Sequence, residues 1–292
     1  MARSERDFVL IGLIGDGIGR SLSPLLHQRE ADRQGIRLVY TTIDSRELGL
    51  TAADLPDLLR WARLLGFRGL NVTYPFKQAV VEHLDDLSGE ARSLGAVNTV
   101  VFEDGRAKGY NTDWFGFRRG FERSFAHVRQ DRVVQLGAGG AGSAVAHAML
   151  TRGARHLTLI DLDVDKAKQL ESALADEFGP ARVSTGLPED LAALLASADG
   201  VINATPVGMA HHPGTPVPES ALRPDLWVAD IVYRPTATPL LVAAQAVGAP
   251  TLHGGGMNVF QAVAAFEYFT GATADLEAML ADSAELLTDG PL

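Results

Sequence analysis

The sequence of 292 residues predicts an α/β fold made of two open, mostly parallel α/β domains. Short apolar runs alternate with amphipathic stretches from one end of the chain to the other, which is typical of parallel sheets covered by helices. The chain is long enough to build one large or two medium hydrophobic cores. A glycine-rich turn near the middle, between an apolar run and an amphipathic stretch, marks the start of a new strand-turn-helix unit.

Eight apolar runs have the length expected of strands. They cover residues 8–14, 38–43, 69–73, 99–102, 132–136, 157–160, 200–203 and 227–232. The helix-like stretches cover residues 23–33, 53–65, 114–124, 140–152, 163–177, 238–247, 257–270 and 274–287.

The boundary between the domains is predicted near residues 113–130. A hairpin turning at Asp104-Gly105 is expected to end the first sheet, and a helix beginning at Asp113 leads to a fresh strand. Three glycines precede the last two helices, which we expect to return to the first domain. The predicted substrate-binding domain is therefore 1–114, completed by 256–292, and the predicted nucleotide-binding domain is 115–255.

Composition excludes several classes of protein. Cysteine is absent, which rules out disulfides, thiolate nucleophiles and cysteine-based zinc sites. The net charge of −10, without a basic block, argues against a nucleic-acid partner. No apolar run approaches the ~18 residues of a membrane span, and no secretory signal begins the chain, so a cytoplasmic protein is expected. His211 and His212 lie in a proline-rich stretch without carboxylates, so no metal site is predicted.

A dinucleotide fingerprint follows the strand at 132–136. Gly137 permits a tight turn, Gly139 lets the backbone approach a pyrophosphate, and Gly142 allows close packing of helix and strand. The following helix offers free N–H groups to phosphates. The pattern predicts a Rossmann domain whose loop consists of Gly137, Ala138, Gly139, Gly140, Ala141 and Gly142.

Asp161 ends the next predicted strand. A carboxylate there can accept hydrogen bonds from both adenosine ribose hydroxyls and repels a 2′-phosphate. No arginine follows it, and Lys166 is the first basic residue. The sequence therefore favours NAD over NADP. The alternative is a helix N-cap, a role equally open to Asp163.

A second group of polar residues points to a substrate site. Asn71-Val72-Thr73-Tyr74-Pro75-Phe76-Lys77 ends a strand at a proline, and the lysine follows at the start of a predicted helix. Strand ends of this kind are the usual place for ligand contacts in open α/β sheets. Ser21 and Ser23 precede the first predicted helix, with Pro24 expected at its first position. Capping alone would explain Ser23 but not Ser21.

The motifs together resemble the shikimate dehydrogenase family, including its quinate/shikimate dehydrogenases. They are SxSP, NVTxPxK, GAVNT, GxNTD, GAGGAG, NATPxGM and GxxMxxxQA, spread from Ser21 to Ala262. The pairing of NVTxPxK with GxNTD is specific to that family. The resemblance implies an NAD-dependent dehydrogenase of the shikimate pathway, with quinate as a second or even preferred substrate.

The resemblance also implies roles for individual residues. Lys77 and Asp113 would flank the reacting oxygen, where an ammonium stabilises developing negative charge and supplies a proton. The carboxylate would keep the lysine charged and hold the product hydroxyl. The implied substrate-binding residues are Ser21, Ser23, Thr73, Asn98, Tyr233 and Gln261. Besides the glycine loop and Asp161, the implied cofactor-binding residues are Asn203, Thr205, Gly254 and Met257.

Two departures from the family pattern and several alternatives remain. NADP-dependent members resemble one another in an Asn-Arg-Thr/Ser run where this chain has Asp161-Leu162-Asp163, and Gln28 follows His27 where asparagine is usual. An aminoshikimate-type dehydrogenase and a metabolite sensor are the alternative functions, although a sensor has no need of a Lys–Asp pair.

The expected partner is a small hydroxy acid, and the sequence leaves open whether the protein is a monomer or a homodimer.

Overall fold

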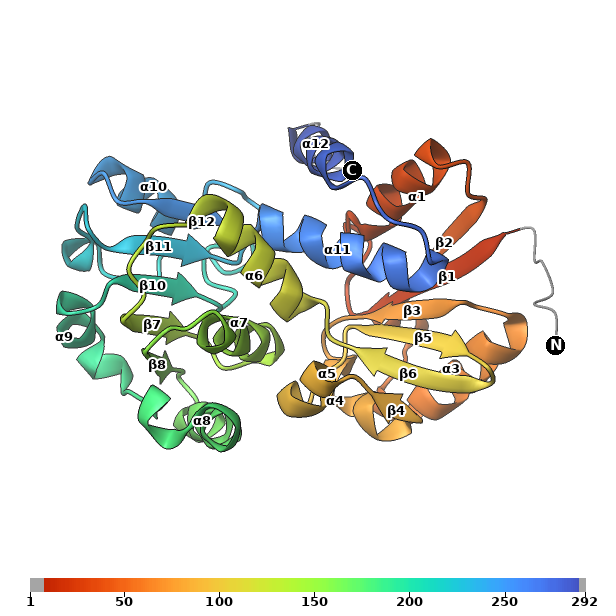
Figure 1. Cartoon of the computed structure of the whole chain (residues 1–292), viewed down its shortest axis with the longest axis horizontal. Helices are drawn as coiled ribbons and strands as arrows, with labels where there is room; N and C mark the ends of the chain where they lie inside the picture. The colour runs from red at the N-terminus through yellow and green to blue at the C-terminus, as the bar shows by residue number, and fades with distance from the viewer. Residues whose placement is uncertain (1–7, 289–292) are drawn as a thin grey trace. The chain divides into compact units, whose positions relative to one another are not determined.

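The computed structural model describes residues 8–288 and divides the chain into two compact units (Figure 1). The first unit comprises the chain up to Thr112 together with the part from Val259 onward. The second unit is Asp113–Asn258. Each unit is an open sheet covered by helices, as the alternation of apolar and amphipathic segments predicts.

The first unit is built on a six-stranded sheet in the order β2-β1-β3-β5-β6-β4. β1 pairs in parallel with β2 and β3, and β4 pairs in parallel with β6. β5 is antiparallel to both its neighbours, β3 and β6, and a tight turn joins it to β6. The strands are β1 (Val9–Gly15), β2 (Leu38–Asp44), β3 (Gly69–Val72), β4 (Asp86–Leu87), β5 (Thr99–Glu103) and β6 (Arg106–Tyr110).

The hairpin between β5 and β6 forms where the sequence predicts it. Asp104 and Gly105 both have positive φ, 49° and 76°, the left-handed conformation that two-residue hairpin turns require. As expected, the hairpin supplies the last strands of this sheet in chain order, but the sequence does not predict β4, which pairs with β6 and forms the edge. β4 has only two residues, and so short a strand leaves no periodic signal in the sequence.

Helices of the first unit cover both faces of its sheet. α3 packs on one face through Leu55, Leu59 and Ala62. The opposite face contacts α11 through Ala265 and Phe269. The helices are α1 (Ser23–Arg33), α2 (Ser45–Leu48), α3 (Leu55–Leu65), α4 (Phe76–Ala79), α5 (Gly89–Leu94), α11 (Gly255–Thr270) and α12 (Leu276–Thr288).

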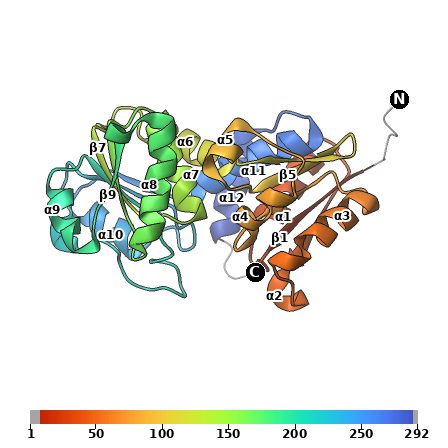
Figure 2. The same ribbon diagram turned by 90° about the horizontal axis from the view of Figure 1, so that it is seen from below.

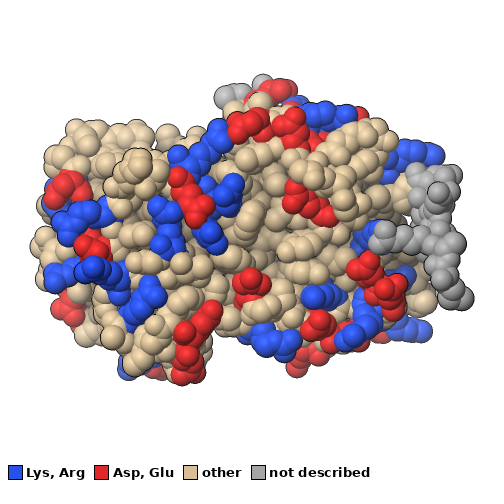
Figure 3. Space-filling view, in the orientation of Figure 1, with Lys and Arg blue, Asp and Glu red and all other residues tan. Residues whose placement is uncertain are grey.

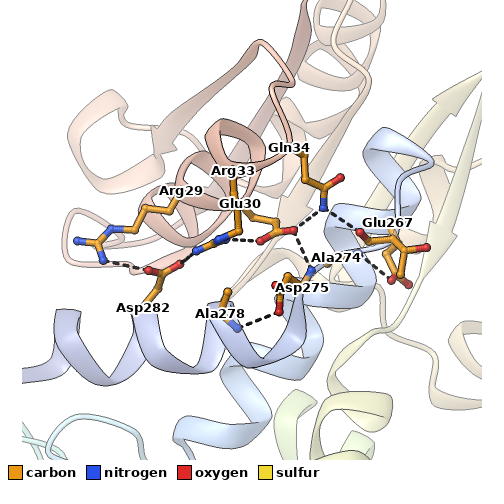
Figure 4. A network of polar contacts seen from close by, with 10 residues as sticks. Arg29, Glu30, Arg33, Gln34, Glu267, Ala274, Asp275, Ala278 and Asp282 are labelled. Atoms are coloured by element: carbon orange, nitrogen blue, oxygen red, sulfur yellow. Dashed lines mark hydrogen bonds and ion pairs between the residues drawn. The ribbon is translucent and has the colours of Figure 1, made fainter.

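A polar network joins α12 to α1 in the first unit (Figure 4). Its centre is Glu30, a fully buried carboxylate that pairs with Arg33 and Gln34 and accepts the Asp275 N–H at 2.8 Å. Arg33 also pairs with Asp282 at 2.6 Å. The network connects residues almost 250 positions apart in sequence, and it holds the last described helix against the helix that begins at the Ser21 to Pro24 segment.

The second unit is an entirely parallel six-stranded sheet in the order β12-β11-β10-β7-β8-β9. Helices lie on both its faces (Figure 2): α6, α7 and α8 contribute to one core cluster, and α9 and α10 to the other. The strands are β7 (Arg132–Leu136), β8 (His156–Ile160), β9 (Val183–Thr185), β10 (Gly200–Asn203), β11 (Trp227–Asp230) and β12 (Thr251–His253). The helices are α6 (Asp113–Ser124), α7 (Gly140–Thr151), α8 (Val164–Phe178), α9 (Leu191–Ala196) and α10 (Pro239–Ala246).

Local sequence signals set several helix ends. Asp163 caps α8 by accepting the Lys166 N–H at 3.2 Å, and Thr238 caps α10 ahead of Pro239. Gly66 ends α3 in the left-handed conformation at φ 87°. These groups satisfy backbone atoms that a helix end otherwise leaves without partners.

Candidate active site

The substrate-side motifs of the first unit meet around the carboxyl end of β3. Thr73 follows that strand directly, and its N–H donates to the carbonyl of Ile14 at 2.9 Å. The turn closes with a bond from the Phe76 N–H to the Thr73 carbonyl, and α4 begins at Phe76. Lys77 is therefore on a short helix that starts where the buried strand ends.

Lys77 is tied to the segment that carries Asn98. Its carbonyl accepts the N–H of Val97 at 2.8 Å, and its side chain is half-buried. Because Asn98 is the next residue, the backbone brings the NVTxPxK and GAVNT motifs together although they are about twenty positions apart.

Asn98 is buried in a network that fixes its amide. Its Oδ1 accepts the Thr112 N–H at 2.7 Å and the Thr99 hydroxyl at 3.1 Å, while its Nδ2 donates to the Thr112 hydroxyl at 3.0 Å. The Thr112 hydroxyl also lies 3.5 Å from Oε1 of Gln261 on α11. The structure thus brings Asn98 and Gln261 together, and the fixed amide has an N–H rather than an acceptor to offer a ligand.

Tyr40 and Asn71 belong to the same network. Asn71 is part of the strand-end motif for which the sequence predicts ligand contacts, whereas Tyr40 was not predicted as a site residue. The Tyr40 hydroxyl donates to Oδ1 of Asn71 at 2.8 Å, and Asn71 donates to the Thr99 hydroxyl at 3.2 Å. Burial raises the pKa of Tyr40, against a hydrogen bond with Ser23 that lowers it. No local pattern identifies Tyr40, since an aromatic residue in a strand is usually a core residue.

The capping interpretation of Ser23 is wrong. α1 begins at Ser23 itself, and Leu22 stands at the cap position without a side-chain hydrogen bond. Pro24 is accordingly the second helical residue, one later than expected. The Ser23 N–H donates to Oγ of Ser21 at 3.3 Å, so the Ser21 hydroxyl lies at the backbone of the first residue of the helix.

Asp44 shapes the loop ahead of these serines. Its two carboxylate oxygens accept the N–H groups of Gly17 and Ile18, both at 2.9 Å. Burial raises the pKa of Asp44, but the backbone N–H donors outweigh it and leave the pKa below its usual value. The carboxylate is therefore an ionised anchor for the loop, and this long-range role leaves no trace in the local sequence.

In the second unit, the glycine loop has the geometry that its spacing predicts. Gly137 has φ 99°, and a Cβ on Gly142 would lie 2.3 Å from the carbonyl oxygen of Gly137. A Cβ on Gly139 would meet no atom within 4 Å. Loop and helix pack too closely for side chains, while the space at Gly139 fits the close approach of a pyrophosphate. Buried Gln135 holds the loop by donating to the carbonyls of Gly137 and Gly142.

Asp161 lies at the end of β8, beside the glycine loop. Its Oδ2 accepts the Ala138 N–H at 2.8 Å, and its Oδ1 accepts the Asp163 N–H at 3.0 Å. Asp163 rather than Asp161 caps α8. Each oxygen of Asp161 keeps a lone pair for a further donor, so the carboxylate is positioned and able to accept ribose hydroxyls.

The other predicted cofactor residues lie at the carboxyl ends of β10, β11 and β12. Asn203 is fully buried and its amide is occupied by Thr205, Val207 and Asp230, so it positions the Thr205 loop from within. Burial raises the pKa of Asp230. A Cβ on Gly254 would lie 2.1 Å from the carbonyl oxygen of Ile231, and half-buried Met257 packs on the core beside that residue.

The remaining predicted residues of the second unit are Tyr233 and Asp113. Tyr233 follows β11 and is half-buried, and burial raises its pKa. Asp113 is buried and begins α6. Because Asp113 is bonded to Thr112, its Cα lies about 3.8 Å from that of Thr112, a member of the Asn98 network. Lys77 belongs to the first unit and Asp113 is the first residue of the second.

Other features of the described residues offer no competing site. A hollow of about 780 Å³ in the second unit is lined by residues such as Arg132, His156 and Trp227 at the amino ends of strands, whereas open α/β sheets bind ligands at the carboxyl ends. Within residues 8–288, no group of three metal-ligating side chains lies together and no helix has the length and apolarity to cross a membrane. On the face drawn in Figure 3, described basic and acidic side chains are interspersed.

Comparison with known proteins agrees with this geometry. Residues 13–100 match the shikimate dehydrogenase substrate-binding domain, and residues 133–213 match the saccharopine dehydrogenase NADP-binding domain. A shikimate dehydrogenase (NADP(+)) of Streptomyces avermitilis is 56% identical over 96% of this chain and 97% of its own length. A quinate/shikimate dehydrogenase (NAD(+)) of Corynebacterium glutamicum is 45% identical over 94% and 97%.

Solved structures show the same similarity. Quinate dehydrogenase from Corynebacterium glutamicum in complex with NAD superposes with a TM-score of 0.90 at 45% identity, covering 95% of this chain and 99% of that one. Shikimate 5-dehydrogenase from Listeria monocytogenes, in complex with shikimate and NAD, has a TM-score of 0.85 at 31% identity and covers 96% and 97%. With its two-unit α/β fold, its glycine loop and these relatives, the chain belongs to the shikimate dehydrogenase family of NAD(P)-dependent oxidoreductases.

Proposed function

We propose that this enzyme prefers NAD and interconverts shikimate and 3-dehydroshikimate, with quinate and 3-dehydroquinate as a second substrate pair. The preference for NAD is inferred from Asp161. Backbone N–H groups hold its carboxylate beside the glycine loop, and the residues directly after it, Leu162 and Asp163, include no arginine. The Corynebacterium glutamicum dehydrogenase in complex with NAD supports the same choice. The Streptomyces avermitilis relative is named for NADP(+), so the preference needs a direct test.

In the proposed mechanism, residues of this chain orient the substrate and transfer a proton to or from its reacting oxygen. Ser21 and Ser23 bind the substrate carboxylate through their hydroxyls, and the bond from the Ser23 N–H to Oγ of Ser21 holds the Ser21 side chain at the start of α1. Thr73, Asn98 and Gln261 hold the ring hydroxyls, and Tyr233 closes the far side. The nicotinamide, when bound, carries the hydride. Lys77 stabilises negative charge on the reacting oxygen and supplies its proton during reduction, and Asp113 accepts a hydrogen bond from the product hydroxyl.

The second candidate is an enzyme that acts principally on quinate. The similarity to a solved quinate dehydrogenase, at 45% identity over nearly the whole chain, is the observation that favours it. Steady-state kinetics on shikimate and quinate, each with NAD and with NADP, decides between the candidates through four kcat/KM values. Absence of turnover with both acids would contradict the proposed function.

We expect NAD to be preferred over NADP by at least about tenfold in kcat/KM, or about 1.4 kcal/mol. Asp161→Ala should narrow this gap, because the ribose hydroxyls lose an acceptor and a 2′-phosphate is no longer repelled. The matched control is Asp163→Ala, which removes the α8 cap at a cost of about 1 kcal/mol in stability but leaves the cofactor ratio unchanged. Equal use of both cofactors by the unaltered enzyme would refute the assignment.

Replacing Ser21 and Ser23 together by Ala should raise the substrate KM by about tenfold or more, because hydrogen bonds to a charged carboxylate are lost. The melting temperature should change far less than KM, since neither serine occupies the cap position of α1. Ser88→Ala is the opposite control: Ser88 caps α5 by accepting the Ala91 N–H at 3.2 Å, so its loss should lower stability and spare KM. A lower melting temperature with unchanged KM in the double variant would assign the serines a structural role only.

A further inference from the structure

Asp230 is a buried carboxylate that the proposed mechanism does not use. It is the last residue of β11 and 1% exposed, so it lies at the carboxyl edge of the parallel sheet of the second unit. Ligands of open α/β sheets bind outside this edge, and a buried charge is costly in free energy unless other groups hydrogen-bond to it. We infer that Asp230 is a positioning residue of the active site, an inference that rests on the proposed function. Its Oδ1 fixes the loop that carries Thr205, on the cofactor side, to the segment that carries Tyr233, on the substrate side.

Three neutral donors surround this carboxylate. Its Oδ1 accepts hydrogen bonds from Nδ2 of Asn203 and from the N–H of Val232, both at 3.0 Å. Its Oδ2 accepts the hydroxyl of Thr238 at 2.7 Å. Within residues 8–288, no basic side chain forms an ion pair with it. Because none of the three donors carries a charge, the carboxylate holds three segments in place rather than balancing a cation.

On the cofactor side, Asp230 fixes the orientation of the Asn203 amide. An ionised carboxylate can only accept hydrogen bonds, so it selects the NH2 end of the amide and turns the carbonyl end away. The same NH2 also donates to the Val207 carbonyl at 2.9 Å. The carbonyl end accepts the Thr205 N–H at 3.0 Å and the Thr205 hydroxyl at 2.6 Å, and that hydroxyl accepts the Val207 N–H at 3.2 Å. Asp230 therefore holds the Thr205 loop through a single amide.

On the substrate side, the same oxygen holds the start of the segment that carries Tyr233. The N–H that binds it belongs to Val232, the buried residue directly before Tyr233. The Val232 carbonyl accepts the Gly254 N–H at 3.3 Å, which ties the segment to another predicted cofactor residue. The nitrogens of Asn203 and Val232 both lie 3.0 Å from one oxygen atom, so they are no more than twice that distance apart. Displacing the carboxylate of Asp230 would therefore move both segments.

The other oxygen of Asp230 has a separate, structural role. Thr238 caps α10 by accepting the Leu241 N–H at 3.3 Å, so its hydroxyl proton is available to Oδ2 of Asp230. Gly208, the residue after Val207, passes beside this pair: a Cβ there would lie 3.8 Å from Oδ2 and 3.4 Å from Cβ of Thr238. Because the partners of Oδ1 and Oδ2 belong to different segments, substitutions can remove their hydrogen bonds separately.

Asp230→Ala should raise the dissociation constant of the reduced cofactor and the KM of the acid by about tenfold each, because small displacements of positioning groups are costly. Fluorescence titration without substrate measures the first, using the reduced cofactor that the unaltered enzyme prefers. Thr238→Val is the matched control: it removes the bond to Oδ2 and the α10 cap, so it should lower the melting temperature but change both constants less than about twofold. Asp230→Asn keeps an oxygen for Asn203 and Val232 and loses the charge, so it should raise both constants only about threefold.

A double-mutant cycle tests the shared oxygen. Asn203→Ala cuts the connection to Thr205, so adding Asp230→Ala should raise the cofactor dissociation constant by less than about twofold further, while the KM of the acid still rises. If Asp230→Ala does not fold, Asp230→Asn takes its place in both comparisons.

Three results would overturn the inference. They are unchanged constants in a folded Asp230→Ala enzyme, equal kinetic losses in Asp230→Ala and Thr238→Val, and additive effects of Asp230→Ala and Asn203→Ala on cofactor affinity. Absence of turnover by the unaltered enzyme with both acids would instead contradict the proposed function, and the cofactor titration would still test the connection through Asn203.

Discussion

Lys77→Met is expected to lower kcat by roughly 10²–10⁴, the range for removal of a positioned acid–base group. Methionine keeps much of the volume of the lysine stem and removes the ammonium. The backbone should hold its place, because the Lys77 carbonyl binds the Val97 N–H whatever the side chain. NAD affinity should barely change, since the glycine loop and Asp161 belong to the second unit. Steady-state kinetics with both acids and fluorescence titration with NADH provide the measurements.

Lys108→Met is the matched control for this variant. Lys108 is a lysine of the same unit that pairs with Asp86 at 3.6 Å on the surface, and its loss should leave kcat within about twofold because exposed ion pairs contribute little. If Lys77→Met retains near-normal kcat, Lys77 is not the acid–base group. An increase in KM at unchanged kcat would assign it to substrate binding alone.

Glu30→Ala should lower the free energy of unfolding of the first unit by about 2–4 kcal/mol. The substitution leaves the Gln34 amide and the Asp275 N–H without their buried acceptor and deprives Arg33 of one of its two carboxylates. It also loosens α12 from α1. Urea denaturation followed by circular dichroism measures the loss, with thermal melting as a second readout.

Glu285→Ala tests the same helix pair without the buried charge. Glu285 pairs with Arg29 at 3.0 Å but is 57% exposed, so its removal should cost no more than about 1 kcal/mol. Similar losses for Glu30→Ala and Glu285→Ala would contradict the central role of the buried carboxylate. A Glu30→Gln variant should fall between them, because it keeps an acceptor for the Asp275 N–H and loses the charge.

The sequence by itself determined the features that depend on near neighbours. The Gly137 to Gly142 loop was predictable because its tight turn needs the positive φ of Gly137, and because a Cβ on Gly142 would lie 2.3 Å from the Gly137 carbonyl oxygen five positions earlier. The β5–β6 hairpin followed from Asp104-Gly105 for the same reason. The mostly parallel α/β class came from periodicity over whole segments, which survives errors of one or two residues at each boundary. Lys77 was identified by its position after a strand-ending proline, whereas its joint role with Asp113 was implied by the family resemblance and stays a prediction.

Only the tertiary structure decided which polar groups meet across long stretches of chain. Glu30 and Asp275 are 245 positions apart, and neither residue carries a local mark of the other. Serine is a residue type typical of helix caps, yet Ser23 is the first residue of α1 and Leu22 occupies the cap position. Tyrosine in a strand is typical of a core residue, yet the Tyr40 hydroxyl donates to Asn71 in the network of the candidate active site. The residue type determines which hydrogen bonds a side chain can form. The chain topology determines which partner comes within hydrogen-bond distance. Burial then makes an unpaired polar group costly in free energy, so the groups that meet are paired.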